Sequence, residues 1–390
     1  MTLASSPQDH HSRRASYAAH VTEKVVAAVK VAPGTTELRD LPVPDVAPDA
    51  GLLRIEAAGI CGSDVRSYPK PSRHGEPHVM GHENVGRVVA LGVEAARRWG
   101  VREGDRVALE EYLPCGRCNV CRSGEYRFCT QTDIHRGGIA VRYGSTPLSV
   151  PPGLWGGFSE MLYLHPSSIL HTVDDKTPPE LAALALPIAN GWQWAHVEGG
   201  AGPGRSVLIV GPGQQGLGCV VAAKEAGADL IVVAGTSRDV ERLEIARTLG
   251  ADHVVNVDAD DLIDRVRSQT GGRGVDLAID TAAASDVTVG AALGALKDKG
   301  GVVLIAAGAM DQTIASFPVG IVKRKYATLK GVRGHGHESV GRAIAIITSG
   351  AYPLHLLATH QLGLARVDEA LRTAAAAGAA IHVAVVPGLP

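Results

Sequence analysis

Four of the six cysteines of the chain fall within one short stretch. They are Cys115, Cys118, Cys121 and Cys129, separated by two, two and seven residues. Four soft thiolates in one loop form the donor set of a closed, tetrahedral zinc site. An iron–sulfur cluster uses the same donors, whereas disulfides are disfavoured because no other cysteine-rich segment accompanies these residues. The spacing therefore predicts a structural zinc lobe.

A second chemical motif is a glycine-rich turn that follows the apolar residues 207–210. The turn contains Gly211, Gly213, Gln214, Gln215 and Gly216. Glycines at this spacing permit a tight strand-to-helix turn and let the backbone approach a pyrophosphate. The N–H groups at the start of the following helix add partial positive charge. A purely structural turn is the alternative, but the surrounding strand, helix and second strand favour dinucleotide binding.

The residues that follow the second strand bear on the choice of coenzyme. A site for NAD places an acid about 20 residues after the glycines, where it binds the ribose hydroxyls. Here the chain has Ser237 and Arg238, and the first acid is Asp239. A hydroxyl and a guanidinium suit a 2′-phosphate, which a carboxylate would repel. We predict a preference for NADP(H) over NAD(H); the alternative is that Arg238 is a solvated residue at a helix start.

The chain pattern supplies the elements that must position these motifs. Between residue 25 and about residue 170, short β-branched runs broken by Gly and Pro predict a β-rich domain with long loops. From residue 205, apolar runs alternate with helical patterns, which is typical of a parallel α/β sheet. We expect strands at 25–31, 52–57, 85–91, 206–210, 230–234, 253–256, 275–279, 302–306 and 381–386, and helices at 240–249 and 339–349.

Composition limits the classes of function. The chain has 390 residues, with 38 Lys and Arg against 40 Asp and Glu, and a formal net charge of −2. Such a balance supplies no large field for binding nucleic acid or an acidic membrane. The chain has no apolar run of about 18 residues, and its polar start lacks the apolar centre of a signal peptide. We expect a soluble, cytoplasmic protein with a disordered leader over residues 1–22.

The motifs and their order resemble those of the zinc-type alcohol dehydrogenase family of the medium-chain dehydrogenase/reductase superfamily. The resemblance runs from about Val25 to Pro387. Besides the cysteine lobe and the glycine-rich turn, it rests on Gly59–Asp64 (GICGSD), Gly81–Gly86 (GHENVG), Gly104–Val107 (GDRV) and Gly156–Glu160 (GGFSE).

This resemblance implies an α/β protein of two domains. A β-rich, GroES-like catalytic domain is expected over residues 23–185 and 321–390. A Rossmann dinucleotide-binding domain with a doubly wound parallel sheet is expected over residues 186–320. The family also implies a homodimer or a homotetramer, and a small-molecule alcohol or carbonyl compound as substrate.

In such enzymes, the residues that match Cys61 and His82 hold a catalytic zinc in the cleft between the domains. The zinc acts as a Lewis acid that polarises a carbonyl or stabilises an alkoxide. The resemblance implies that Ser63 relays the hydroxyl proton and that Asp64 orients the ligand histidine. Taken singly, Cys61 would be a buried apolar thiol and His82 a structural imidazole.

One of the departures from the family pattern concerns the catalytic zinc. The usual third zinc ligand is a Cys, Glu or Asp, and it aligns on Leu186, which cannot coordinate a metal. Glu83 matches a residue that can approach the metal in relatives. Cys61, His82 and Glu83 would then form the three-ligand, open site that catalytic zinc needs. A site without catalytic zinc is the alternative.

The resemblance implies an NAD(P)(H)-dependent oxidoreductase that interconverts an alcohol and a ketone or aldehyde. Two other functions stay open. One is zinc-independent reduction of an activated carbon–carbon double bond, which Leu186 favours and the retention of Cys61, His82 and Glu83 disfavours. The other belongs to a different class, a redox sensor that binds NADP(H) and structural zinc without turnover.

Overall fold

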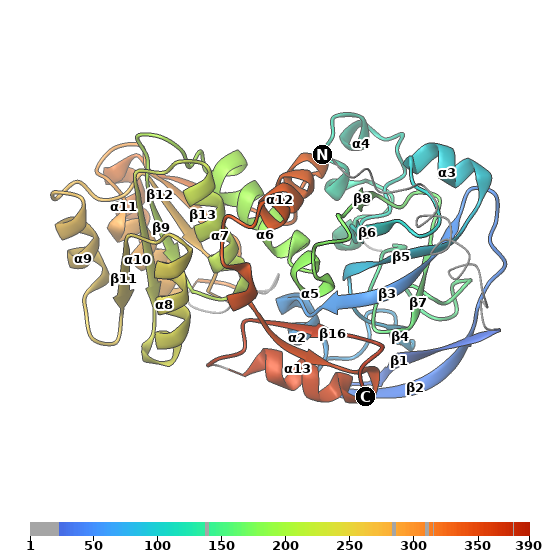
Figure 1. The fold of residues 1–390 in the computed structure, drawn as a ribbon. Helices are drawn as coiled ribbons and strands as arrows, with labels where there is room; N and C mark the ends of the chain where they lie inside the picture. Colours follow the sequence, from blue (N-terminus) through green and yellow to red (C-terminus); the bar gives the residue numbers. More distant parts are fainter. Residues whose placement is uncertain (1–22, 137–139, 283–285, 309–311, 315, 377) are drawn as a thin grey trace, which may run out of the picture. The chain divides into compact units, whose positions relative to one another are not determined.

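The computed structural model describes residues 23–136, 140–282, 286–308, 312–314, 316–376 and 378–390, so the expected leader lies outside the described residues. The chain divides into two compact units (Figure 1). The first comprises the residues up to Ala183 together with His360–Ala375 and Val383–Pro390, and the second comprises Leu184–Thr359 and Ala376–His382. Within the described ranges, no helix is long and apolar enough to cross a bilayer.

The first unit is rich in antiparallel sheet. A three-stranded sheet has the order β2 (Thr35–Pro42), β1 (Lys24–Ala32) and β4 (His78–Val79). A seven-stranded sheet runs β15 (Ala358–Leu362), β16 (His382–Val385), β3 (Gly51–Gly59), β5 (Glu83–Leu91), β6 (Arg106–Leu109) and β8 (Leu170–Thr172), while β7 (Met161–Leu164) also pairs with β3. The helices are α2 (Gly62–Ser67), α3 (Val93–Trp99), α4 (Asn119–Arg122), α5 (Pro179–Ala182) and α13 (Val367–Ala375).

The second unit is built on a parallel sheet of six strands. Its order is β11 (His253–Asn256), β10 (Leu230–Gly235), β9 (Ser206–Val210), β12 (Leu277–Asp280), β13 (Val302–Ile305) and β14 (Thr328–Gly331). This order, with the first strand central, is that of a doubly wound dinucleotide-binding sheet. The helices are α6 (Ala185–Trp192), α7 (Gln214–Glu225), α8 (Val240–Leu249), α9 (Leu262–Gln269), α10 (Asp286–Ala295), α11 (Val319–Lys325) and α12 (His337–Ser349).

The sheet of the second unit confirms the predicted α/β class, and β9, β11 and α8 occupy the predicted residues. Strand β14 is the strand of this parallel sheet that the sequence pattern missed. Its residues are mostly exposed and form no apolar run, because it lies at the edge of the sheet. Since β14 extends this sheet, residues 321–359 cluster with the second unit, whereas the resemblance had assigned them to the catalytic domain.

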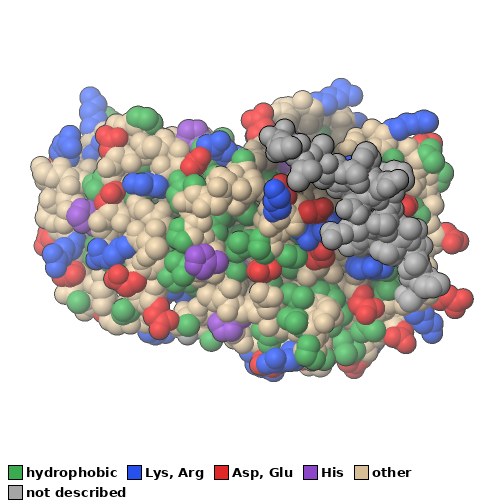
Figure 2. Space-filling view, in the orientation of Figure 1, with side chains coloured by type: hydrophobic (Ala, Val, Ile, Leu, Met, Phe, Trp, Pro, Cys, Tyr) green, Lys and Arg blue, Asp and Glu red, His purple; other side chains and the backbone are tan. Residues whose placement is uncertain are grey.

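The described surface carries mixed charge. On the face drawn in Figure 2, basic and acidic side chains are interspersed and are not gathered by sign. This distribution agrees with the nearly balanced composition.

His78 is a buried histidine in β4, where its backbone lies opposite Lys30 of β1. The residue is only 7% exposed. Burial, followed by the positive charge of Lys30, lowers the pKa of His78 to about 4, against opposing contributions from Glu76 and Asp64. His78 is therefore neutral in the folded protein at neutral pH.

We predict that His78 makes the protein less stable in mild acid. An unfolded histidine binds a proton near pH 6.5, whereas folded His78 does so only near pH 4, so the unfolded state binds more protons between these values. The contribution of His78 is complete above pH 6.5, and about 3 kcal/mol is lost as the pH falls to 4. Urea unfolding against pH should give a shallower decline for His78→Gln, and identical slopes would contradict the prediction.

Candidate metal and coenzyme sites

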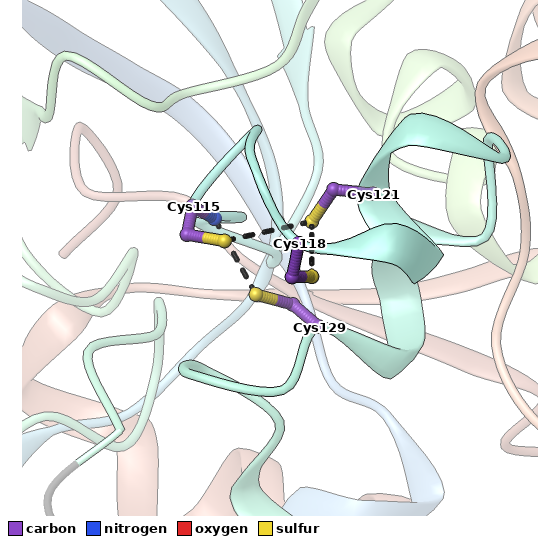
Figure 3. Close-up of side chains that lie close together, drawn as sticks. All are labelled: Cys115, Cys118, Cys121 and Cys129. Carbon is purple, nitrogen blue, oxygen red and sulfur yellow. Dashed lines mark hydrogen bonds between the residues drawn. The ribbon is translucent and has the colours of Figure 1, made fainter.

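The four cysteines of the predicted zinc lobe converge in one loop after β6 (Figure 3). Cys118 precedes α4, Cys121 lies within it, and Cys129 follows a short turn at Tyr126–Phe128. The Sγ atoms of Cys118 and Cys121 are 3.4 Å apart, and those of Cys115 and Cys121 are 4.0 Å apart. All four sulfur atoms lie within 4.8 Å of one another. Tetrahedral zinc with Zn–S bonds of about 2.3 Å needs sulfur atoms about 3.8 Å apart, so the cluster fits this ion.

Hydrogen bonds favour the thiolate form at Cys118 and Cys129, whereas burial, followed by the hydrogen bond with Cys118, raises the pKa of Cys121 to about 12. The backbone N–H of Thr130 is the main cause that lowers the pKa of Cys118 to about 5. Burial raises the pKa of Cys129, but hydrogen bonds, chiefly from the side chain of Thr132 and the backbone N–H of Cys115, bring it down to about 7. All six cysteines of the chain are free thiols, so the disulfide alternative has no support in the structure.

A buried carboxylate anchors this lobe to the sheet. Glu110, directly after β6, is completely buried. The hydroxyl of Tyr126, from within the lobe, donates to its two oxygens at 2.9 and 2.7 Å. On the other side, Nε2 of His171 in β8 lies 2.7 Å from Oε1 of Glu110. The lobe and the seven-stranded sheet therefore share one buried hydrogen-bond network, which sequence spacing did not reveal.

The second cluster brings together Cys61, His82 and Glu83: Cys61 is 21 and 22 residues from the other two, which are adjacent in the chain. Cys61 lies between the end of β3 and α2, while Glu83 is the first residue of β5. Because β3 and β5 pair antiparallel, with Gly59 opposite Glu83, the two segments meet at one end of the sheet. One ligand atom of each of the three residues lies within 4.8 Å of the others.

Asp64 lies beside two of these residues and fixes their orientation. The backbone N–H of Cys61 donates to Oδ2 of Asp64 at 3.0 Å, and Nδ1 of His82 lies 3.3 Å from Oδ1. Burial lowers the pKa of His82, but the adjacent Asp64 carboxylate raises it more, so that it lies well above its ordinary value. With Nδ1 directed at Asp64, Nε2 faces Ser63, whose Oγ is 3.4 Å away. Nε2 is thus the nitrogen available to a metal.

The GGFSE motif supports the histidine segment through close backbone contact. The N–H of Gly157 donates to the carbonyl of Gly81 at 2.9 Å. Gly81 has a φ of 89°, and a Cβ there would lie 2.5 Å from the ring of Phe158. A Cβ on Gly157 would lie 1.7 Å from Oδ1 of Asn84. Both glycines are required because side chains would separate the two segments.

Leu186, at the position of the usual third ligand, is a buried residue of α6 in the second unit and is 3% exposed. A leucine side chain has no donor atom. The assignment of Glu83 as the third protein ligand therefore stays a prediction. Glu83 is itself buried, with 2% exposure.

The glycine-rich turn joins β9 to α7 as predicted. Gly211 has a φ of 97°, and a Cβ on Gly216 would lie 1.9 Å from the carbonyl oxygen of Gly211. Gly213 precedes α7 in an extended conformation, and a Cβ there would meet no atom within 4 Å. Gly211 and Gly216 are therefore needed for the turn itself. Gly213 leaves open space at the N-terminus of a 12-residue helix, as a bound pyrophosphate requires.

Two glutamines add a second sign of a ligand at this turn. Nε2 of Gln214 and Oε1 of Gln215 are buried and have no hydrogen-bond partner within the described part of the chain. Buried polar atoms are rarely left unpaired in a complete assembly. The residues present thus fit a polar group such as the coenzyme, which would supply the missing partners.

Ser237 and Arg238 follow β10, and both are exposed. Asp239, the nearest acid, caps its own helix: its Oδ2 accepts from the backbone N–H and the hydroxyl of Thr236 at 2.9 and 2.7 Å. Asp258, which the sequence analysis did not consider, lies after β11 and accepts from the N–H of Ser237 at 2.8 Å. Parallel pairing of β10 with β11 brings this carboxylate to the candidate coenzyme site.

Known proteins share this organisation. Residues 47–175 match the alcohol dehydrogenase GroES-like domain, and residues 216–349 match the zinc-binding dehydrogenase family. A probable alcohol dehydrogenase of Mycobacterium tuberculosis is 36% identical over 90% of this chain and 94% of its own length. An erythritol/L-threitol dehydrogenase of Mycolicibacterium smegmatis is 30% identical over 94% and 99%. The crystal structure of an alcohol dehydrogenase from Thermotoga maritima superposes with a TM-score of 0.80 at 25% identity, covering 93% of this chain and 99% of that one.

The fold, the thiolate lobe and these relatives define an NAD(P)-dependent oxidoreductase that acts on alcohols. The chain belongs to the zinc-type alcohol dehydrogenase family of the medium-chain dehydrogenase/reductase superfamily.

We predict that Cys118→Ser removes about one zinc ion per chain and lowers Tm by more than about 5 °C, because a hydroxyl does not replace a soft thiolate ligand and the lobe loses its crosslink. Metal content is measured by mass spectrometry of the purified protein, and Tm by calorimetry. Cys219→Ser is the matched control, since Cys219 is a buried thiol of α7 outside both clusters. Equal metal content in the two variants would contradict a zinc site in the lobe.

Proposed function

We propose that the protein is a zinc- and NADP(H)-dependent dehydrogenase that interconverts an alcohol and its ketone or aldehyde. The observation that carries this proposal is the convergence of Cys61, His82 and Glu83 beside Asp64 and Ser63. Three protein ligands with a remaining open position are typical of catalytic zinc, whereas a structural site such as the four-cysteine lobe is closed.

In the proposed reaction, bound zinc supplies Lewis acidity toward the substrate oxygen and the coenzyme accepts or donates the hydride. Cys61 Sγ, His82 Nε2 and a carboxylate oxygen of Glu83 would hold the metal. Asp64 holds the Nδ1 proton of His82, which keeps Nε2 directed at the ligand cluster. Ser63 Oγ would relay the hydroxyl proton of the alcohol, accepting it while its own hydroxyl proton passes to solvent, and the reverse transfer would serve carbonyl reduction.

The proposed NADP(H) preference rests on Ser237 and Arg238 at the end of β10, because a hydroxyl and a guanidinium bind a 2′-phosphate. Asp258 is the competing feature. Its carboxylate is held beside Ser237 and would favour the ribose hydroxyls of NAD. The balance between Arg238 and Asp258 thus decides the coenzyme.

The substrate and the assembly are narrower proposals. Two relatives are named for sorbitol and for erythritol or L-threitol, so polyols belong in the first panel of substrates. We also propose the homodimer or homotetramer that the family implies. Strand β14 lies at the edge of its sheet with exposed residues, and such an edge can pair with a second copy.

Reduction of an activated double bond without catalytic zinc is the second candidate, and the leucine at position 186 is the observation that favours it. The metal count separates the two functions. Two zinc ions per chain support the alcohol dehydrogenase, whereas a single zinc ion together with enone reduction supports the alternative.

We predict that Arg238→Ala lowers kcat/KM with NADPH about 10- to 100-fold and changes the value with NADH little, because the lost charge-assisted bonds are worth about 1.5–3 kcal/mol. Asp258→Asn should shift the preference in the opposite direction, toward NADPH, since it removes a nearby negative charge. Steady-state kinetics with both coenzymes measure the two effects. Unchanged coenzyme ratios in both variants would refute a role of this pair.

We predict that Glu83→Gln weakens the second zinc site while the lobe keeps its ion, because an amide is a poorer ligand than a carboxylate. Zinc content should fall from two ions per chain toward one, and alcohol oxidation should fall at least tenfold. Cys61→Ala should have the same effect. If chelation and Cys61→Ala both leave the activity intact, the metal at this site is not catalytic.

A further inference from the structure

Lys30 is a buried lysine in the middle strand of the three-stranded sheet. The residue is 1% exposed, and its Nζ donates to the carbonyl oxygens of Ser67 and Lys70 at 2.7 and 2.8 Å. Lysine is rarely buried so completely unless its charge has partners, because removing an ammonium group from water costs free energy. The position therefore calls for an explanation other than core packing.

The carbonyl of Ser67 is the last of α2, the helix that follows Cys61 and carries Ser63 and Asp64, and the carbonyl of Lys70 lies in the turn after this helix. The last carbonyls of a helix lack partners within it and carry partial negative charge, so a cation at this end is favourable. A helix of six residues has few internal hydrogen bonds and depends on such contacts for its position. The hydroxyl of Ser67 adds a bond to the carbonyl of Asp64 at 3.1 Å.

Lys30 also contacts the other arm of the candidate zinc site. Its backbone pairs with His78 of β4, and the chain continues from β4 directly to His82. Its ammonium interacts favourably with the negative charge of Asp64, while burial lowers the pKa of Lys30. Lys30 thus contacts both the segment of α2, which carries Asp64, and the segment of β4, which leads to His82. The same two segments also contact each other directly, through Asp64 and His82.

We propose that Lys30 is a positioning residue of the catalytic centre: by binding the end of α2 and pairing with β4, it sets the contact of Asp64 with His82 and the placement of Cys61. This inference rests on the proposed function for its effect on catalysis. Its effect on the geometry of α2 is independent of that function.

The experiment compares Lys30→Met with Lys325→Met. Lys325 is also 1% exposed, and its Nζ donates to the carbonyls of Gly294, at 2.8 Å, and Leu296 at the end of α10 in the second unit. Both substitutions replace a buried, carbonyl-binding ammonium with an apolar chain of similar length. A comparable fall in Tm for the two variants shows that they share the same loss of stability.

Three measurements then separate positioning from stability. For Lys30→Met, we expect the dissociation constant of the second zinc to rise about tenfold or more, kcat to fall by a similar factor with a smaller change in KM, and alkylation of Cys61 by iodoacetamide, followed by mass spectrometry, to accelerate several-fold. For Lys325→Met, we expect all three to match the unsubstituted protein.

The alkylation rate of Cys61 tests the positioning role of Lys30 independently of the proposed function, because it requires neither bound zinc nor turnover. If the unsubstituted protein holds only one zinc and oxidises no alcohol, the proposed function fails. A faster alkylation of Cys61 in Lys30→Met alone would still support the positioning role. Equal alkylation rates in the two lysine variants would overturn the inference, as would equal zinc affinities and equal kcat values in a protein that holds two zinc ions.

Discussion

The carboxylate of Asp64 is the interaction on which the candidate catalytic centre depends. It receives the backbone N–H of Cys61 and lies against Nδ1 of His82, so one buried side chain sets both a thiol and an imidazole. The local segments alone do not fix these orientations. Cys61 precedes a helix of only six residues, and His82 lies in the connection between two strands. A ligand set without such support would lose orientation and affinity for a metal.

Close backbone packing supplies the rest of this support. The segments around Gly81 and Gly157 approach within hydrogen-bond distance, and neither position has room for a Cβ. In the second unit, a Cβ on Gly218 of α7 would lie 2.8 Å from the carbonyl oxygen of Pro187, so this glycine lets α7 approach α6. Much of the excess glycine in the composition thus serves contacts between segments, in addition to the coenzyme turn.

Charge is buried in this protein where it organises a site. Glu110 joins the hydroxyl of Tyr126 in the zinc lobe to His171 in the sheet, and Lys30 joins α2 to β1. Each group gives up hydration and regains hydrogen bonds from partners of fixed geometry. Such networks favour one arrangement of the chain over others, which matters where ligands from distant segments must meet.

The sequence alone determined the features that depend on local spacing. The thiolates of Cys115 to Cys129 are close in the chain, and the strand–turn–helix at Gly211 is encoded by glycine spacing and apolar runs, so both were predictable. The tertiary structure decided what depends on strand pairing. Edge strand β14, the approach of Asp258 to Ser237, and the links made by Glu110 and Lys30 involve residues whose neighbours are remote in sequence. Hydrophobic periodicity does not predict such contacts. The pattern around a buried polar residue is the same whichever remote segment that residue contacts.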